Sequence, residues 1–127
     1  MNGQIKVLIV DDQKAIREMF AVYLRIKGFQ CFVAENAVEA ITIQQRDMPD
    51  LVVTDLNMPE TNGLELLRKL RSEAPDLPVI LMSGGGDRLA AEASDAFRFL
   101  PKPFNLQELE RTIRLAIGLK SVAPHSA

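Results

Sequence analysis

Short runs of apolar residues, many of them β-branched, recur along the chain and alternate with segments of helical periodicity. Such runs, about four to eight residues long, are typical of strands buried on both faces of a parallel sheet. The third run stops at a carboxylate, Asp55, and a loop with Pro59 and an Asn62–Gly63 pair follows it. We expect strands at residues 5–10, 29–34, 50–55, 79–82 and 97–100.

Between the strands, apolar residues recur at intervals of three and four, which predicts helices. Asn36 and Asn105 are typical N-caps, and Gly28 is expected to close the first helix. We expect helical segments at about 13–28, 36–49, 63–73 and 89–96, and a last one from about residue 105. The apolar faces of the first two should comprise Ile16, Met19, Phe20, Tyr23, Leu24, Val38, Ala40, Ile41 and Ile43. The basic residues of the third should be solvated: Arg68, Lys69 and Arg71.

Strands and helices that alternate in this way predict an α/β fold with a doubly wound, right-handed parallel sheet flanked by helices. The common solution for five strands is the flavodoxin-like order 2-1-3-4-5, in which the first and third strands are neighbours. We expect one domain over residues 1–120, followed by a flexible tail at 121–127.

The composition of the 127-residue chain narrows the function classes. Its formal net charge of −2 gives no reason to expect nucleic acid or an anionic membrane as a partner. The one cysteine, Cys31, cannot form an internal disulfide and lies in an apolar run that favours burial. No apolar stretch is long enough to span a bilayer, and the N-terminus lacks a signal-peptide pattern, so we expect a cytoplasmic protein.

Acidic residues follow two strands that the predicted topology makes neighbours. Asp11 and Asp12 follow the first strand and Asp55 ends the third, so three carboxylates should share one crevice. Ser83 and Lys102, after the fourth and fifth strands, are expected at its rim. Mg²⁺ offsets the repulsion of crowded carboxylates, because oxygen ligands suit it, and it recruits phosphate. Lys102 and Ser83 would contact phosphoryl oxygens, and Asp55 would act as a nucleophile toward phosphorus.

Each of these residues also has a plainer explanation. Asp55 could merely cap a turn, and the Asp11–Asp12 pair after a strand is more often a helix N-cap than a metal site. Lys102 is usually a surface lysine and Ser83 part of a turn, although flanking prolines fix where Lys102 points. The functional interpretation rests on position, because all these residues fall at carboxyl ends of predicted strands.

With these motifs, the chain resembles the receiver domain of response regulators over about residues 6–119. Each motif is weak alone, but together and in this order they are highly specific. The motifs are Asp11–Asp12, Asp55–Pro59 with Gly63, Ser83–Gly84 and Lys102–Phe104.

The resemblance implies that Asp55 accepts a phosphoryl group from a histidine of a sensor kinase or of a phosphotransfer protein. It implies Mg²⁺ as the cofactor. The metal would be held by the side chains of Asp12 and Asp55, by the backbone carbonyl of Asn57 and, through water, by Asp11.

The resemblance also implies how the phosphoryl group is sensed. Lys102 would pair with the group, next to a cis bond to the following proline, and the backbone of Asn57 and Gly84 would contact it. Ser83 would move toward the group, and Phe99 would swing inward behind it. The surface of the fourth helix, fifth strand and fifth helix would change as a population shift, and a partner would read that change.

Three features depart from the usual family pattern. Ser83 stands where threonine is commoner, and Phe99 where tyrosine is frequent. The segment between them is about one helical turn short and begins with three glycines, so we expect the fourth helix to be short, displaced or mobile.

The leading hypothesis is a phosphorylatable binding switch rather than a turnover enzyme. The chain ends soon after the last helix, so it is expected either to act alone on a downstream protein or to be a fragment without its output domain. An aspartate-nucleophile phosphohydrolase is the enzymatic alternative, but it would need a second acid where Asn57 stands. An unphosphorylated pseudo-receiver is the third possibility, and the complete set of acid, hydroxyl and lysine argues against it.

Overall fold

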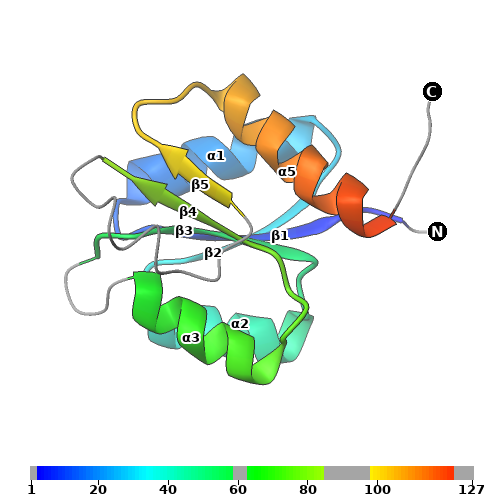
Figure 1. The fold of residues 1–127 in the computed structure, drawn as a ribbon. Helices are drawn as coiled ribbons and strands as arrows, with labels where there is room; N and C mark the ends of the chain where they lie inside the picture. Colours follow the sequence, from blue (N-terminus) through cyan, green and yellow to red (C-terminus); the bar gives the residue numbers. More distant parts are fainter. Residues whose placement is uncertain (1–2, 59–62, 85–97, 122–127) are drawn as a thin grey trace.

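The computed structural model describes three stretches of the chain, residues 3–58, 63–84 and 98–121. Within them lie five strands and four helices (Figure 1). The strands are β1 (Lys6–Val10), β2 (Gln30–Ala34), β3 (Leu51–Asp55), β4 (Val79–Ser83) and β5 (Arg98–Pro101). The helices are α1 (Lys14–Ile26), α2 (Ala37–Asp47), α3 (Gly63–Glu73) and α5 (Leu106–Ser121).

The strands form one parallel sheet in the order β2-β1-β3-β4-β5, which confirms the predicted topology. Helices α1 and α5 cover one face, and α2 and α3 cover the other (Figure 1). Alternate residues of a strand therefore enter different cores: Val7 and Ile9 pack in the core that includes α1 and α5, and Leu8 and Val10 in the core that includes α2 and α3. Because both faces are covered, the central strands are apolar along their length.

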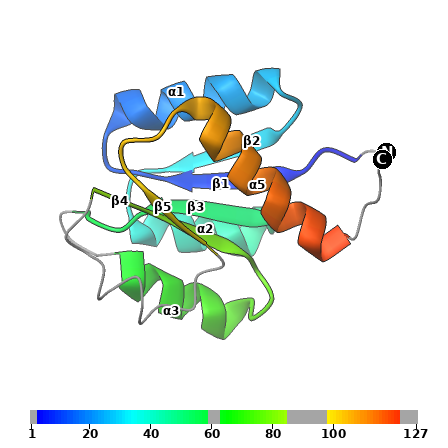
Figure 2. The ribbon, with the colours of Figure 1, turned by 45° about the horizontal axis from the view of Figure 1, so that its top comes forward.

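The register of the sheet aligns the carboxyl ends of the strands along one edge (Figure 2). Val10 of β1 is level with Thr54 of β3, so the next residues, Asp11 and Asp55, leave the two strands side by side. On the other side of β3, Asp55 is level with Met82, the residue before Ser83. This edge is therefore where the predicted site must form.

The helix ends follow the predicted capping chemistry. The Asn36 side chain accepts the backbone N–H of Glu39 at 2.9 Å. Asn105 accepts the N–H of Glu108 at 2.7 Å, and the Glu108 carboxylate accepts the N–H of Asn105 at 3.0 Å, a reciprocal capping box. Gly28, at φ +101°, follows α1 in the left-handed region that glycine tolerates best.

Three side-chain predictions were wrong. Met19 and Val38 were expected on buried faces, but they are 46% and 76% exposed. Both helices are apolar beyond the stripe that faces the sheet, so periodicity alone did not separate the buried positions from the outer ones. Arg71 was expected to be solvated, but it is half-buried and donates hydrogen bonds to the carbonyls of Pro75 and Leu77.

The strand boundaries differ from the predicted ones by single residues. β1 begins at Lys6 rather than at residue 5, and β2 begins at Gln30, because Phe29 still donates its N–H to the last turn of α1. β5 extends to Pro101. The expectations for a short fourth helix and a frayed tail fall on 85–97 and 122–127, outside the described residues.

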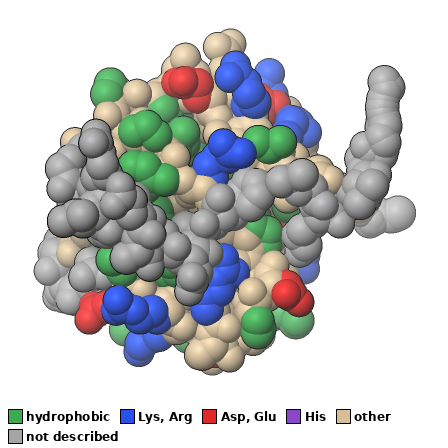
Figure 3. Space-filling model, viewed as in Figure 1, with side chains coloured by type: hydrophobic (Ala, Val, Ile, Leu, Met, Phe, Trp, Pro, Cys, Tyr) green, Lys and Arg blue, Asp and Glu red, His purple; other side chains and the backbone are tan. Residues whose placement is uncertain are grey.

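Three features bear on the expectations drawn from the composition: the distribution of surface charge, the burial of Cys31 and the character of the helices. On the face in Figure 3, Lys and Arg side chains are scattered among apolar and acidic ones rather than gathered in one patch. Cys31 is buried, and burial raises the pKa of its thiol to about 11, so the thiol stays protonated at neutral pH. Across the part of the chain that the structure describes, no helix has both the length and the apolarity to cross a membrane.

Replacing the α5 cap should weaken the fold measurably. Asn105→Ala removes the side-chain oxygen that accepts the Glu108 N–H in the first turn of α5, so we expect the free energy of unfolding in urea to fall by about 1 kcal/mol. Gln107→Ala, at an exposed position in the same turn, is the control and should be close to neutral. Equal effects of the two changes would show that the cap contributes nothing.

Candidate functional site: an acidic pocket at the carboxyl edge of the sheet

Asp11 is held at the end of β1 by three hydrogen bonds. Its N–H donates to the carbonyl of Ala34 at 3.1 Å, its Oδ1 accepts the N–H of Gln13 at 2.9 Å, and its carbonyl accepts from Arg17 Nη1 at 3.0 Å. The residue is 1% exposed. Asp11 is therefore a buried carboxylate with a fixed direction, although it also supports the start of α1 as an N-terminal acid would.

Asp55 ends β3 and is 5% exposed. Its Oδ1 accepts the backbone N–H of Asn57 at 3.2 Å, and its Oδ2 lies 3.4 Å from Lys102 Nζ. The turn-capping role that the sequence left open is thus real, but it uses only one carboxylate oxygen. The other oxygen faces Lys102, which directly follows β5.

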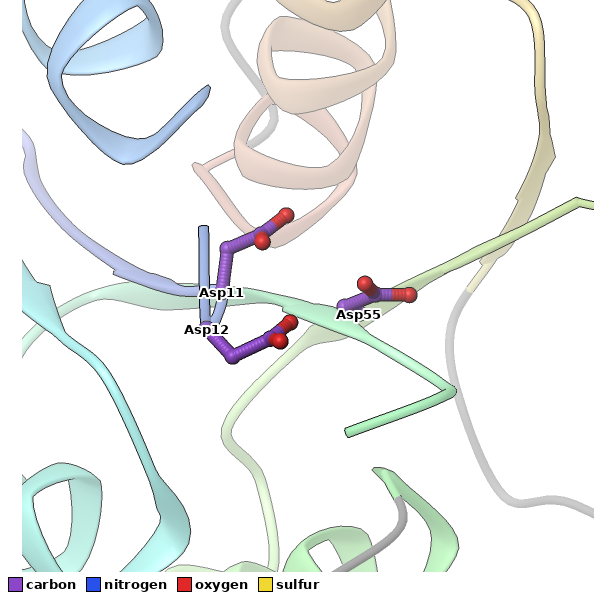
Figure 4. A group of neighbouring side chains, drawn as sticks. All are labelled: Asp11, Asp12 and Asp55. Atoms are coloured by element: carbon purple, nitrogen blue, oxygen red, sulfur yellow. The ribbon is translucent and has the colours of Figure 1, made fainter. Parts of the chain in front are cut away.

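Three carboxylates converge at this edge. Asp11 and Asp12 lie next to each other after β1, with Asp55 across from them (Figure 4). One oxygen from each of the three lies within 4.8 Å of the others. Asp12 is exposed, whereas Asp11 and Asp55 are buried, so the cluster has one side open to solvent.

The electrostatics of the pocket disfavour three ionised acids. Burial raises the pKa of Asp11, and the charges of Asp55 and Asp12 raise it further. The hydrogen bond from Gln13 and the charge of Lys102 oppose this rise in pKa without cancelling it. A cation in the pocket would relieve the repulsion.

The donor set fits a hard divalent cation. All three groups offer carboxylate oxygens, the ligands of Mg²⁺ and Ca²⁺ rather than of softer metals. At a metal–oxygen distance of about 2.1 Å, two oxygens on one Mg²⁺ are at most about 4.2 Å apart, and an oxygen that binds through water can be further away. The observed spacing suits direct binding by some of these oxygens with water completing the shell.

Ser83 and Lys102 reach the same edge from β4 and β5. Ser83 is fully buried as the last residue of β4, and its carbonyl accepts the N–H of Lys102 at 2.6 Å. The Lys102–Pro103 peptide bond is cis, as the sequence resemblance implied. The lysine of the predicted constellation is thus tied by its backbone to the serine and by its ammonium to Asp55.

The remaining predicted site residues are Asn57, Gly84 and Phe99. The structure shows where they lie, but it does not test the roles predicted for them. Asn57 is exposed two residues after the end of β3, and Gly84 is exposed directly after β4. Phe99 of β5 is half-buried against the core on the side of α2 and α3. Metal ligation by the Asn57 carbonyl, the phosphoryl contacts of Asn57 and Gly84, and the switching of Ser83 and Phe99 stay predictions.

Two residues that support the site were missed from the sequence. Gln13 contributes a backbone N–H, which no side-chain pattern reveals. Arg17 could have been found, because it lies one turn before the buried Ala21 on the sheet side of α1, where a charged residue needs a specific partner.

This combination of fold and pocket defines a class: a doubly wound domain with an oxygen-only acidic cluster and a lysine at the carboxyl edge of its sheet. The family model for the response regulator receiver domain matches residues 7–114. The chain therefore belongs to the response regulator receiver family. The match is to this family, which was the leading hypothesis from the sequence.

Individual proteins agree with this assignment. The chain is 39% identical over 113 residues to the response regulator MprA of Mycobacterium leprae, a match that covers 87% of this chain and 50% of that protein. The chain thus spans about half the length of the curated relatives that it matches.

Solved structures give the same fold. A response regulator receiver domain protein from Clostridium thermocellum superposes with a TM-score of 0.85 at 31% identity, covering 93% of this chain and 98% of the other. The chemotaxis response regulator CheY4 of Vibrio cholerae gives 0.83 at 28% identity, covering 90% and 99%.

A methyl group at Gly63 should displace the acidic edge. A Cβ there would lie 2.7 Å from the carbonyl oxygen of Asp55 and 2.9 Å from Cα of Leu56, both backbone atoms that cannot move aside locally. We expect Gly63→Ala to lower the free energy of unfolding by about 1–3 kcal/mol and to shift the amide resonances around Asp55.

The control for Gly63→Ala is Gly118→Ala in α5, where a Cβ meets nothing within 4 Å. That change should stabilise the protein by up to about 1 kcal/mol, since alanine favours helix. Two glycine changes that both stabilise the protein would contradict the close approach at Gly63.

Neutralising Asp11 should stabilise the metal-free protein. A carboxyl whose pKa is raised by folding binds its proton more tightly when folded, so its ionisation costs stability as the pH rises above the ordinary value of 3.8. With a chelator present at pH 7, the Asp11→Asn variant should therefore unfold at a higher urea concentration than the unmodified protein. This gain in stability should shrink as the pH falls toward 3.8.

Asp76→Asn, at an exposed position, is the control for Asp11→Asn and should change stability by less than about 0.5 kcal/mol. A gain from Asp11→Asn that did not depend on pH would mean that ionisation of the buried Asp11 carboxyl is not its cause.

Proposed function

We propose that Asp55 is the phosphoacceptor of this receiver domain and that it takes its phosphoryl group from a phosphohistidine. The observation that carries the proposal is the buried Asp55 carboxylate, with Lys102 Nζ 3.4 Å from one oxygen and the carboxylates of Asp11 and Asp12 within 4.8 Å. A lone turn-capping aspartate would require neither neighbour.

In the proposed reaction, an oxygen of Asp55 forms a bond to phosphorus as the phosphorus–nitrogen bond to histidine breaks. The leaving imidazole keeps the electron pair of that bond, and a proton from solvent neutralises it. Lys102 holds a phosphoryl oxygen through its ammonium, which is already paired with the attacking carboxylate. Such transfer depends mainly on positioning and charge neutralisation, which these fixed groups provide.

We propose Mg²⁺ as the cofactor, held by Asp12 and Asp55 directly, by the Asn57 carbonyl, and by Asp11 through water. When bound, Mg²⁺ neutralises phosphoryl charge and brings the anionic donor to an acidic pocket. The oxygen-only donor set supports this assignment. The exposed side of Asp12 supports the water-bound part of the shell, because it leaves room for solvent.

The domain would act as a switch rather than as a turnover enzyme. Asn57 stands two residues after the proposed nucleophile and offers no carboxylic acid to protonate a leaving alcohol. That supports a stable acyl phosphate over general phosphomonoester hydrolysis. The intact constellation of acid, hydroxyl and lysine supports phosphorylation over a pseudo-receiver role.

The partners proposed are a sensor histidine kinase or a histidine phosphotransfer protein upstream, and downstream either a separate protein or an output domain. Relatives about twice as long support an output domain as the alternative to a separate target. The readout through Ser83, Phe99 and the surface near β5 and α5 belongs to this proposal. The cytoplasmic location expected from the sequence stays a prediction.

Incubation with acetyl phosphate and Mg²⁺, followed by intact mass measurement, tests the proposal. We expect one phosphate adduct, which Asp55→Asn or a chelator abolishes. Asp76→Asn, an exposed acid outside the pocket, is the matched control and should keep the adduct. An adduct that survives Asp55→Asn would identify another acceptor, and continuous hydrolysis of phosphomonoesters would favour the phosphohydrolase.

A further inference from the structure

Arg17 is a largely buried cation beside the acidic pocket, to which neither the phosphoryl chemistry nor the metal site assigns a role. Its side chain is 13% exposed, on the sheet side of α1. Nη1 donates to the backbone carbonyl of Asp11 at 3.0 Å, and Nη2 lies 4.0 Å from the Glu35 carboxylate. Burying a guanidinium costs free energy unless such partners compensate for the lost water.

The carbonyl that Arg17 holds belongs to the peptide plane that joins Asp11 to Asp12. Because a peptide unit is planar, fixing its carbonyl also fixes its N–H and the Cα of Asp12. The preceding plane is fixed as well, since the N–H of Asp11 donates to Ala34 of β2. Arg17 therefore fixes the position of the Asp12 Cα, from which the exposed carboxylate projects, without an ion pair to either aspartate.

The second neighbour of the Arg17 guanidinium, Glu35, has a backbone contact of its own. The Glu35 N–H donates to the Glu39 carboxylate at 2.9 Å, and Glu39 belongs to the capped first turn of α2. Glu35, whose carboxylate lies 4.0 Å from Arg17 Nη2, is thus joined by its backbone to the start of α2. Among the parts of the chain described, Arg17 is the one side chain that donates to the Asp11 backbone.

We propose that Arg17 is a positioning residue for the cation site, which holds the Asp11–Asp12 peptide so that both carboxylates point at a common ion. This rests on the proposed function, because the ion is the Mg²⁺ assigned there. The contact that carries this role is the hydrogen bond from Arg17 Nη1 to the Asp11 carbonyl.

Arg25 provides a matched control on the same helix. It also donates from Nη2 to a backbone carbonyl of β2, that of Cys31, at 2.9 Å, two turns away from the pocket. Arg17→Met and Arg25→Met each delete one guanidinium–carbonyl bond between α1 and the sheet region. Only the first lies next to a proposed metal ligand.

The test is the dissociation constant for Mg²⁺, measured by calorimetry and by the shift of the Asp12 amide resonance. We expect Arg17→Met to weaken binding about tenfold, as loss of a group that orients a ligand does, and Arg25→Met to leave it unchanged. Saturating Mg²⁺ should restore phosphorylation of Arg17→Met by acetyl phosphate, because Asp55 and Lys102 are intact.

Arg17→Lys covers the case in which Arg17→Met does not fold. Lysine keeps the charge and a donor for the Asp11 carbonyl but lacks the second arm that faces Glu35. We therefore expect the Mg²⁺ affinity of Arg17→Lys to lie between that of the unmodified protein and the tenfold loss expected for Arg17→Met. Equal Mg²⁺ affinity in all variants would overturn the positioning role and leave the phosphoacceptor intact. Absence of Mg²⁺ binding by the unmodified protein would overturn the metal site itself, and the positioning role with it.

Discussion

The pairing of β1 with β3 is the constraint on which the site depends. The two strands are far apart in sequence, yet their register makes Val10 level with Thr54. That register sends Asp11 and Asp55 out of the sheet at the same height. A slip of one residue would turn one of the two acids toward the opposite face, and the shared cluster would be lost. The apolar residues of both strands enforce the register, because each alternate set fills a different core.

Much of the fold and of the site followed from the sequence because both depend on where strands end. Continuous apolar runs marked the strands, and the polar residue after each run marked the functional edge. This reasoning placed Asp11, Asp55, Ser83 and Lys102 correctly at that edge. It failed where the outcome depends on three-dimensional packing, as with the exposed Val38, whose apolar character fits a buried face equally well.

Sequence analysis also missed side chains that donate hydrogen bonds to backbone carbonyls. Arg71 was assigned to solvent as a basic residue on a helix, and Arg17 was not singled out, although its place on the sheet side of α1 was a signal. In the structure both donate to backbone carbonyls of loops at helix or strand ends, where carbonyls lack regular partners. Nothing in the sequence shows which carbonyl will be left without a ladder partner, since that depends on how two loops meet.

The pocket illustrates how a fold can hold a group of acids that repel one another. The free-energy cost of ionising a buried acid falls on Asp11, whose pKa is raised by burial. The apolar cores on both faces of the sheet stabilise the whole domain. The acids are held through the backbone: Asp11 by Ala34 and Gln13, and Asp55 by Asn57. The lysine is held in the same way, since its N–H binds the Ser83 carbonyl while its ammonium meets Asp55. Lys102 therefore joins the Asp55 carboxylate to the carboxyl end of β4, through its ammonium at one contact and its backbone N–H at the other.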